Sequence, residues 1–305
     1  LAHTTMFPLD FEEFLWACNV PAVTIDYVRE CFIKNEVVES FIHEKFMDLF
    51  SKYVLVGGMP DAVNAYVNTN DFAKVEMAHE TIEEYNKKDI AKYANANERL
   101  KIKEIYELLP SELNSKTKRF QLSHVTSKLR TTDISLSFSW LRAAGVAIPV
   151  YTVVVAEIPL RMSEERTYLK LFHEDTGLLT HMMMDASLKN KILNREKDIN
   201  FGAIYENICA QLLTAHCFET LYYLNNKKIG EVDFLIEQDS KVIPIEIKSG
   251  KYYEKHSALN NLLSKEQYDI PYGIIFCNSN VVIKDKYKYL PIYMLEFLHK
   301  RERYY

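Results

Sequence analysis

Two acidic residues and a lysine near the end of the chain have the types and spacing of a metal-dependent phosphodiesterase site. They are Asp233, in one run of alternating apolar and polar residues, and Glu246 and Lys248, in the next. Two carboxylates about 5 Å apart across a strand pair repel by about 3 kcal/mol at an effective dielectric near 20. We therefore expect Asp233 and Glu246 to bind Mg²⁺ or Mn²⁺, which would polarise a phosphate while Lys248 stabilises negative charge.

The turn between the two runs determines whether the acids meet. If Asp239-Ser240 is a two-residue turn, Gln238 faces Lys241. Counting back from that pair places Asp233 directly opposite Glu246. The sequence therefore predicts a β-hairpin with both carboxylates on one face.

The other face of this hairpin is predicted to be fully apolar, because side chains alternate along a strand. Its members would be Val232, Phe234, Ile236, Ile243, Ile245 and Ile247. The competing interpretation is that any half-exposed antiparallel pair alternates in this way, with its charged residues simply in solvent.

Glu206 is a fourth candidate for the site. Its helical neighbours are the small residues Gly202, Ala203, Cys209 and Ala210, which indicate a face packed closely against a sheet. A carboxylate on such a face needs a partner, so Glu206 could bind the metal or a water. The alternative is that it lies on the solvent edge of an amphipathic helix.

The elements around these residues are predicted to follow the order αβββαβ, the common core of restriction-endonuclease-like nucleases. They are Phe201–Leu213, Thr220–Leu224, Lys228–Glu237, Lys241–Ser249, Tyr253–Lys265 and Tyr272–Cys277.

The first hundred residues have mainly helical periodicity. A turn at Gly57-Gly58-Met59-Pro60 joins two helices, and further helices are expected over 71–86 and 98–109, the latter ending at Pro110. No glycine-rich phosphate loop occurs, so we expect this chain neither to bind nor to hydrolyse ATP.

A winged helix-turn-helix is predicted next, with helices at Leu100–Leu109, Ser123–Leu129 and Asp133–Ala144 and a strand at Val150–Val155. Its third helix carries Arg142 as its only cation, so reading of DNA bases is disfavoured. A packing or docking role is the preferred interpretation.

Composition limits the partners. The 305 residues carry a formal net charge of −5, and only residues 98–142, with 9 basic against 5 acidic residues, are basic. Such a patch could contact a few phosphates, but a solvated helical face is the preferred interpretation. The five cysteines are scattered and form no CxxC pair, which favours the cytoplasm, and no apolar run is long enough to span a membrane.

Five segments, in this order, resemble the C-terminal half of bacterial and archaeal AAA-type ATPases that end in a domain of unknown function. The segments are Phe7–Leu15, Gly57–Pro60, Phe201–Asn207, Glu231–Leu235 and Pro244–Gly250. The resemblance implies that a P-loop ATPase half precedes a helical and winged-helix part and a PD-(D/E)xK nuclease-like domain. It also implies that Asp233, Glu246 and Lys248 take the motif positions and Glu206 the helical acid. The ATPase half has no counterpart in this chain.

The predicted fold class is therefore α/β (α+β). The expected division is a helical region at 1–97, a winged-helix-like part at 98–160, a connecting segment at 161–200 and a nuclease-like domain at 201–305. Three functions stay open: a metal-dependent DNA hydrolase, a catalytically silent nuclease-fold module that binds nucleic acid or protein, and a dimerisation region. The expected partners are DNA and either the parent ATPase domain or a second copy of the chain.

Overall fold

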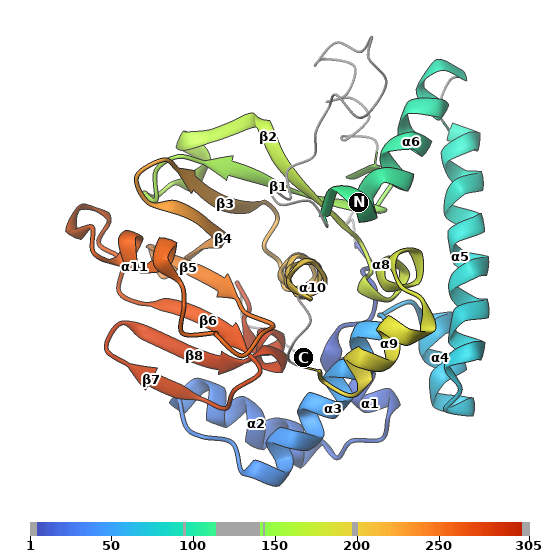
Figure 1. Ribbon diagram of the computed structural model, residues 1–305, viewed down its shortest axis with the longest axis horizontal. Coiled ribbons are helices and arrows are strands. Elements are labelled where there is room, and N and C mark those ends of the chain that lie inside the picture. Colours follow the sequence, from blue (N-terminus) through green and yellow to red (C-terminus); the bar gives the residue numbers. More distant parts are fainter. Residues whose placement is uncertain (1–4, 94–95, 114–140, 143, 197–200, 301–305) are drawn as a thin grey trace.

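The computed structural model describes the chain except residues 1–4, 94–95, 114–140, 143, 197–200 and 301–305 (Figure 1). Its first half is helical. The helices are α1 (Phe11–Ala17), α2 (Ala22–Lys34), α3 (Ser40–Val56), α4 (Pro60–Thr69), α5 (Phe72–Tyr93) and α6 (Ala96–Leu113).

Strands and helices then alternate. The strands are β1 (Ala147–Val153), β2 (Glu164–His173), β3 (Leu221–Asn226), β4 (Gly230–Gln238), β5 (Lys241–Ile247), β6 (Gly273–Cys277), β7 (Val282–Lys284) and β8 (Tyr287–Pro291). The α-helices between them are α8 (Thr176–Met183), α9 (Ala186–Leu193), α10 (Gly202–Ala215) and α11 (Ser257–Leu263). Short 3-10 turns are η2 (Leu160–Ser163), η3 (Glu266–Tyr268) and η4 (Ile292–Phe297).

All these strands form one mixed sheet in the order β2-β1-β3-β4-β5-β6-β8-β7. The pairs β1/β3, β5/β6 and β6/β8 are parallel and the others antiparallel. The mixed α/β class is confirmed, and so is the predicted element order, which appears as α10-β3-β4-β5-α11-β6.

The sheet curves around α10, which is seen end-on near the centre of Figure 1. On that side Ile204 and Ile208 belong to the same apolar core as Phe234 of β4. On the other side Leu259 of α11 packs in a second core with Leu235 of β4. Helices therefore cover both faces of the β4–β5 hairpin.

The hairpin turn is the one the sequence predicts. Asp239 and Ser240 have φ angles of 50° and 59°, and the left-handed conformation at both positions suits a tight two-residue turn. Gln238 pairs with Lys241, and the same register runs back to Phe234 opposite Ile245.

The prediction of one apolar hairpin face was wrong at Val232. Val232 packs on the α11 side, whereas Phe234 packs on the α10 side. The cause is a bulge: Tyr222 pairs with Leu235 but Leu224 pairs with Val232, so β4 has one more residue than β3 in this stretch. An extra residue interrupts the alternation of side chains.

Two element ends also differ from expectation. Helix α6 continues past Pro110 to Leu113, because the buried Leu109 and Leu113 hold its last turn in the core. Helix α11 is shorter than the predicted Tyr253–Lys265.

The Gly-Gly turn joins two helices as predicted, since α3 ends at Val56 and α4 begins at Pro60. Gly57 has a φ of 72°, and a Cβ there would lie 2.2 Å from the Asp175 carboxylate. Any residue with a side chain at position 57 would therefore clash with Asp175.

The winged helix stays a prediction. Its second helix and most of its third, within 114–140, lie outside the described residues. Its predicted strand corresponds to β1, which lies between β2 and β3 in the sheet.

Candidate functional site

The three hairpin residues come together at the end of β4 and β5. Lys248 Nζ lies 2.9 Å from Glu246 Oε2. The Asp233 carboxyl bonds to the backbone of Ile247, the residue between Glu246 and Lys248. The structure therefore brings Asp233, Glu246 and Lys248 together.

Glu246 is almost completely buried, with 3% of its surface exposed. Burial and the neighbouring Asp233 raise the pKa of Glu246 to about 8, although Lys248 acts in the opposite direction. At neutral pH this carboxyl needs either a proton or more positive charge than Lys248 supplies.

Asp233 lies in the bulged part of β4, where its Oδ2 accepts a hydrogen bond of 2.8 Å from the backbone N–H of Ile247. The side chain thus bonds to β5 just beyond the last backbone pair, Phe234 with Ile245. Bulges often redirect a side chain beside a functional site.

Glu206 is buried on the face of α10 that meets the sheet, with 2% of its surface exposed. The packed-face interpretation is confirmed and the solvent-edge alternative is excluded. Its Oε2 lies 3.4 Å from Nζ of Lys170 on β2. Burial and the charges of Asp233 and Glu206 raise the pKa of Cys209, one turn further along α10, so that all three lie in one electrostatic environment.

Lys170 is the residue that sequence reasoning missed. Its side chain is fully buried, its Nζ lies 2.8 Å from Glu231 Oε1, and it lies 4.9 Å from the ring centroid of Tyr223. Burial alone would lower the pKa of Lys170, but Glu206, Asp233 and Glu231 raise it above its ordinary value. The lysine is therefore a permanent internal cation.

A signal for Lys170 does exist in the sequence. It stands within Leu169-Lys170-Leu171-Phe172, where a single charge interrupts an apolar strand. Lysine is almost never fully buried unless it is paired, so a charge in such a run indicates a buried acid elsewhere.

Among the described residues, this acid cluster holds four acids, Glu206, Glu231, Asp233 and Glu246. Two lysines, Lys170 and Lys248, lie beside them. Carboxylate oxygens are the ligands that Mg²⁺ and Mn²⁺ prefer. The carboxyls of Asp233 and Glu246 are therefore the candidate ligands for such an ion.

Two further features concern the cysteines and the possibility of a membrane-spanning helix. All five cysteines are free thiols. Within the described residues, none of the helices has both the length and the apolar character required to cross a membrane.

Comparison with protein families gives two adjacent matches. Residues 47–191 match a domain of unknown function (DUF8612), and residues 201–295 match another domain of unknown function (DUF4143). No curated protein and no solved structure matches the chain significantly. The acid cluster draws on both matched segments, because Lys170 comes from the first and the four carboxylates from the second.

Proposed function

We propose that the segment from α10 to β8 is a divalent-metal-dependent phosphodiesterase domain that hydrolyses DNA. The observation that carries this proposal is the grouping of three residues at the end of a hairpin, where Asp233 bonds to the backbone beside Glu246 and Lys248 pairs with Glu246. The order α10-β3-β4-β5-α11-β6 around them supports it.

Each residue has a distinct role in this proposal. Asp233 and Glu246 would hold Mg²⁺ or Mn²⁺, which supplies Lewis-acid activation of a phosphate when bound. Lys248, whose side chain is 27% exposed, can reach a substrate and stabilise negative charge as it develops. Glu206 would bind either the metal ion itself or a water molecule in the site.

A second candidate function is a catalytically silent module of the same fold that binds nucleic acid or protein. The specific observation in its favour is the position of Lys170, whose buried ammonium group forms ion pairs with Glu206 and Glu231. A resident lysine in the cluster could replace the metal and make the acids purely structural.

Cleavage of a fluorescent DNA duplex, with and without Mg²⁺ or Mn²⁺, separates the two candidates. Asp233→Ala and Glu246→Ala should each abolish cleavage, and Lys248→Ala should slow it by about 100-fold while retaining metal binding in calorimetry. Glu266→Gln, an exposed acid of the same segment, is the matched control and should cleave normally.

The same variants give a stability result. Because burial beside Asp233 disfavours the charged form of Glu246, either alanine variant should be at least as stable as the metal-free parent in urea unfolding. Absence of cleavage together with a marked loss of stability in both variants would refute the hydrolase and support the silent module.

The resemblance to AAA-type ATPases adds a proposal about assembly. We infer that an ATPase domain or a second copy of the chain is the physical partner. Co-purification and light scattering of the full chain test this, and a monomer that binds no ATPase domain would contradict it.

A further inference from the structure

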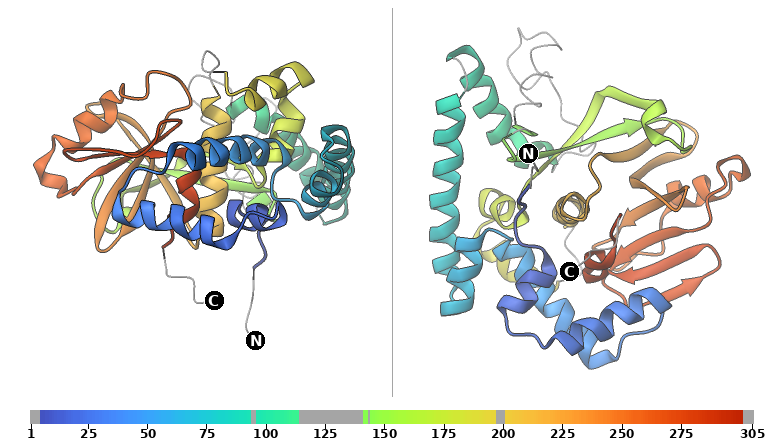
Figure 2. Two further views of the ribbon diagram at one scale, coloured as in Figure 1. Left: turned by 90° about the horizontal axis from the view of Figure 1, so that it is seen from below. Right: turned by 180° about the vertical axis from the view of Figure 1, so that it is seen from behind.

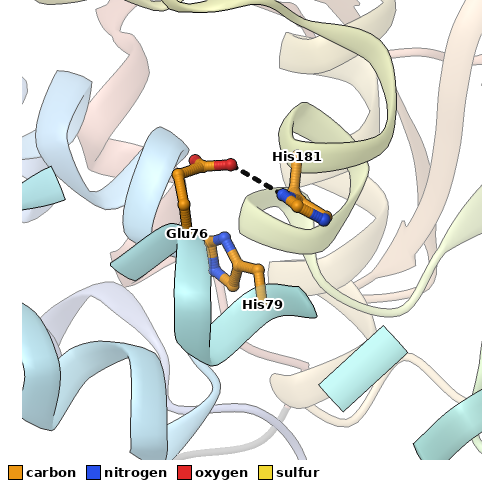
Figure 3. Close-up of side chains that lie close together, drawn as sticks. All are labelled: Glu76, His79 and His181. Atoms are coloured by element: carbon orange, nitrogen blue, oxygen red, sulfur yellow. Dashed lines mark hydrogen bonds and ion pairs between the residues drawn. The ribbon is translucent and has the colours of Figure 1, made fainter. Parts of the chain in front are cut away.

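A second group of metal-ligating side chains lies on α5 and α8, outside the acid cluster. Glu76 and His79 stand three residues apart on α5, which puts them on one helical face, and His181 faces them from α8. Each offers a ligand atom, and these atoms all lie within 4.8 Å of one another. Figure 3 shows the three side chains turned toward a common point.

His79 is oriented as a metal-binding histidine would be. Its ring is fully buried, and Nε2 lies 2.9 Å from the backbone carbonyl of Val56, to which it can donate. Nδ1 is then the nitrogen with the free lone pair, and this buried atom has no hydrogen-bond partner among the residues that the structure describes. A buried polar atom without a partner is costly unless something binds it.

His181 has a similar arrangement. Its Nδ1 lies 2.7 Å from Glu76 Oε2, while its Nε2 lies 3.4 Å from Glu83 Oε2. A carboxylate or carbonyl on the second ring nitrogen fixes the tautomer and orientation of a ligating histidine. Glu83 and Val56 O occupy those outer positions here.

Glu76 supplies an anionic oxygen, and its other oxygen is held by Lys189. Lys189 therefore orients the carboxylate without occupying Oε2, the oxygen that faces His181. A metal ion would replace the hydrogen bond between Glu76 and His181, move those two ligand atoms slightly apart, and bind Nδ1 of His79 as the third ligand atom.

We propose that Glu76, His79 and His181 form a binding site for a divalent transition-metal ion, with Zn²⁺ as the best match. Two imidazoles and one carboxylate suit Zn²⁺, which commonly takes three protein ligands and leaves a fourth position open. Hard ions such as Mg²⁺ prefer all-oxygen ligands and fit poorly. The side chains of Glu76 and His181, 33% and 14% exposed, leave a path for the ion.

This site is independent of the acid cluster. Helix α5 lies across the molecule from β5, β6 and β8 in opposite views (Figures 1 and 2). Its ligands also fall within the first matched segment, residues 47–191, whereas the acids lie in the second. The two proposals can therefore fail separately.

Calorimetric titration of the full chain with Zn²⁺, and with Co²⁺ for its visible spectrum, tests the proposal. We expect one tight site and a spectrum typical of nitrogen and oxygen ligands. Glu76→Gln and His181→Gln should weaken Zn²⁺ binding more than the roughly 10- to 100-fold typical of losing an outer partner, and Glu83→Gln should fall within that range. Glu80→Gln, an exposed acid on the same helix, should bind like the parent.

The controls make the result decisive. Glu246→Gln should keep the Zn²⁺ site, whereas loss of Zn²⁺ in that variant alone would place the ion in the acid cluster and overturn the proposal. Loss in His299→Gln would place it at the other His-Glu group, His216, Glu296 and His299, and would also overturn it. A parent protein that binds no Zn²⁺ at micromolar concentration would show that the three residues are only a hydrogen-bonded contact between α5 and α8.

Discussion

At the scale of single residues, Lys170 supplies the positive charge that neutralises the buried acids of the acid cluster. Its ammonium group is fully buried and faces Glu206, Glu231 and Asp233. A buried ion pair contributes little compared with an apolar pair of the same shape, but removal of one partner leaves an uncompensated buried charge. The cluster should therefore be much more sensitive to loss of the lysine than a surface pair would be.

Replacement of Lys170 by methionine, which keeps the length and apolar stem, should lower the free energy of unfolding by about 3–5 kcal/mol. Urea unfolding of the full chain measures this. The exposed Lys228→Met is the control and should change stability by less than about 0.5 kcal/mol. Equal effects of the two substitutions would show that Lys170 does not neutralise buried acids.

At the scale of elements, the docking of α8 on the end of α3 positions His181. Asp175 caps α8 by accepting a 2.9 Å bond from Leu178 N, and it also accepts a 2.6 Å bond from Gly58 N in the turn after α3. Gly177, in the first turn of α8, lies against the backbone of Val56. One carboxylate and one glycine thus fix the relative position of two helices.

Gly177→Ala should destabilise the protein by about 2–3 kcal/mol, because the new Cβ would lie 2.5 Å from the carbonyl of Val56. Backbone atoms cannot move aside as a flexible side chain can. Gly250→Ala is the matched control, since a Cβ there meets nothing within 4 Å. Thermal unfolding of both variants measures the difference, and a normal melting temperature for Gly177→Ala would contradict the close approach.

At the scale of the whole molecule, contacts between residues that are far apart in the sequence hold the two halves of the chain together. Strands β1 and β2 from before residue 200 continue the sheet formed by β3 to β8. His216, at the end of α10, lies 3.4 Å from Glu296 Oε1 of η4 and 3.8 Å from Asp10 Oδ2, the cap of α1. His216 therefore links α1 and η4, near the two ends of the chain, to the C-terminal end of α10.

The contact at His216 predicts a pH dependence of global stability. Burial alone would lower the pKa of His216, but Glu296 and Asp10 raise it from 6.5 to about 9. Because the folded pKa is the higher one, this stabilisation is fully present below pH 6.5 and is lost as the pH rises through about 9. Relative to His216→Gln, the parent should lose about 1.4 kcal/mol per pH unit across that window.

Urea unfolding of both proteins at several pH values between 6 and 9.5 measures this difference. His43→Gln is the control: burial lowers the pKa of His43, so its removal should not abolish the alkaline loss of stability. Parallel pH profiles for the parent and His216→Gln would contradict a charged, ion-paired His216.

Much of the hairpin could be predicted from the sequence because its determinants are local. The period of two along a strand and a two-residue turn at Asp239-Ser240 set the register from Gln238 to Phe234. For Glu206, small residues at helical spacing indicated a packed face, but the solvent-edge alternative was excluded only by its burial in the structure. These patterns depend on backbone geometry, which neighbouring residues determine by themselves.

Only the tertiary structure decided which distant residues join these local features. Lys170 reaches Glu206 across 36 residues, and His181 reaches Glu76 across 105. The bulge at Asp233 depends on β3 alongside, and the burial of both hairpin faces depends on α10 and α11. The physical reason is that spacing along the chain determines which side chains share a face, whereas the burial of apolar surface determines which faces meet.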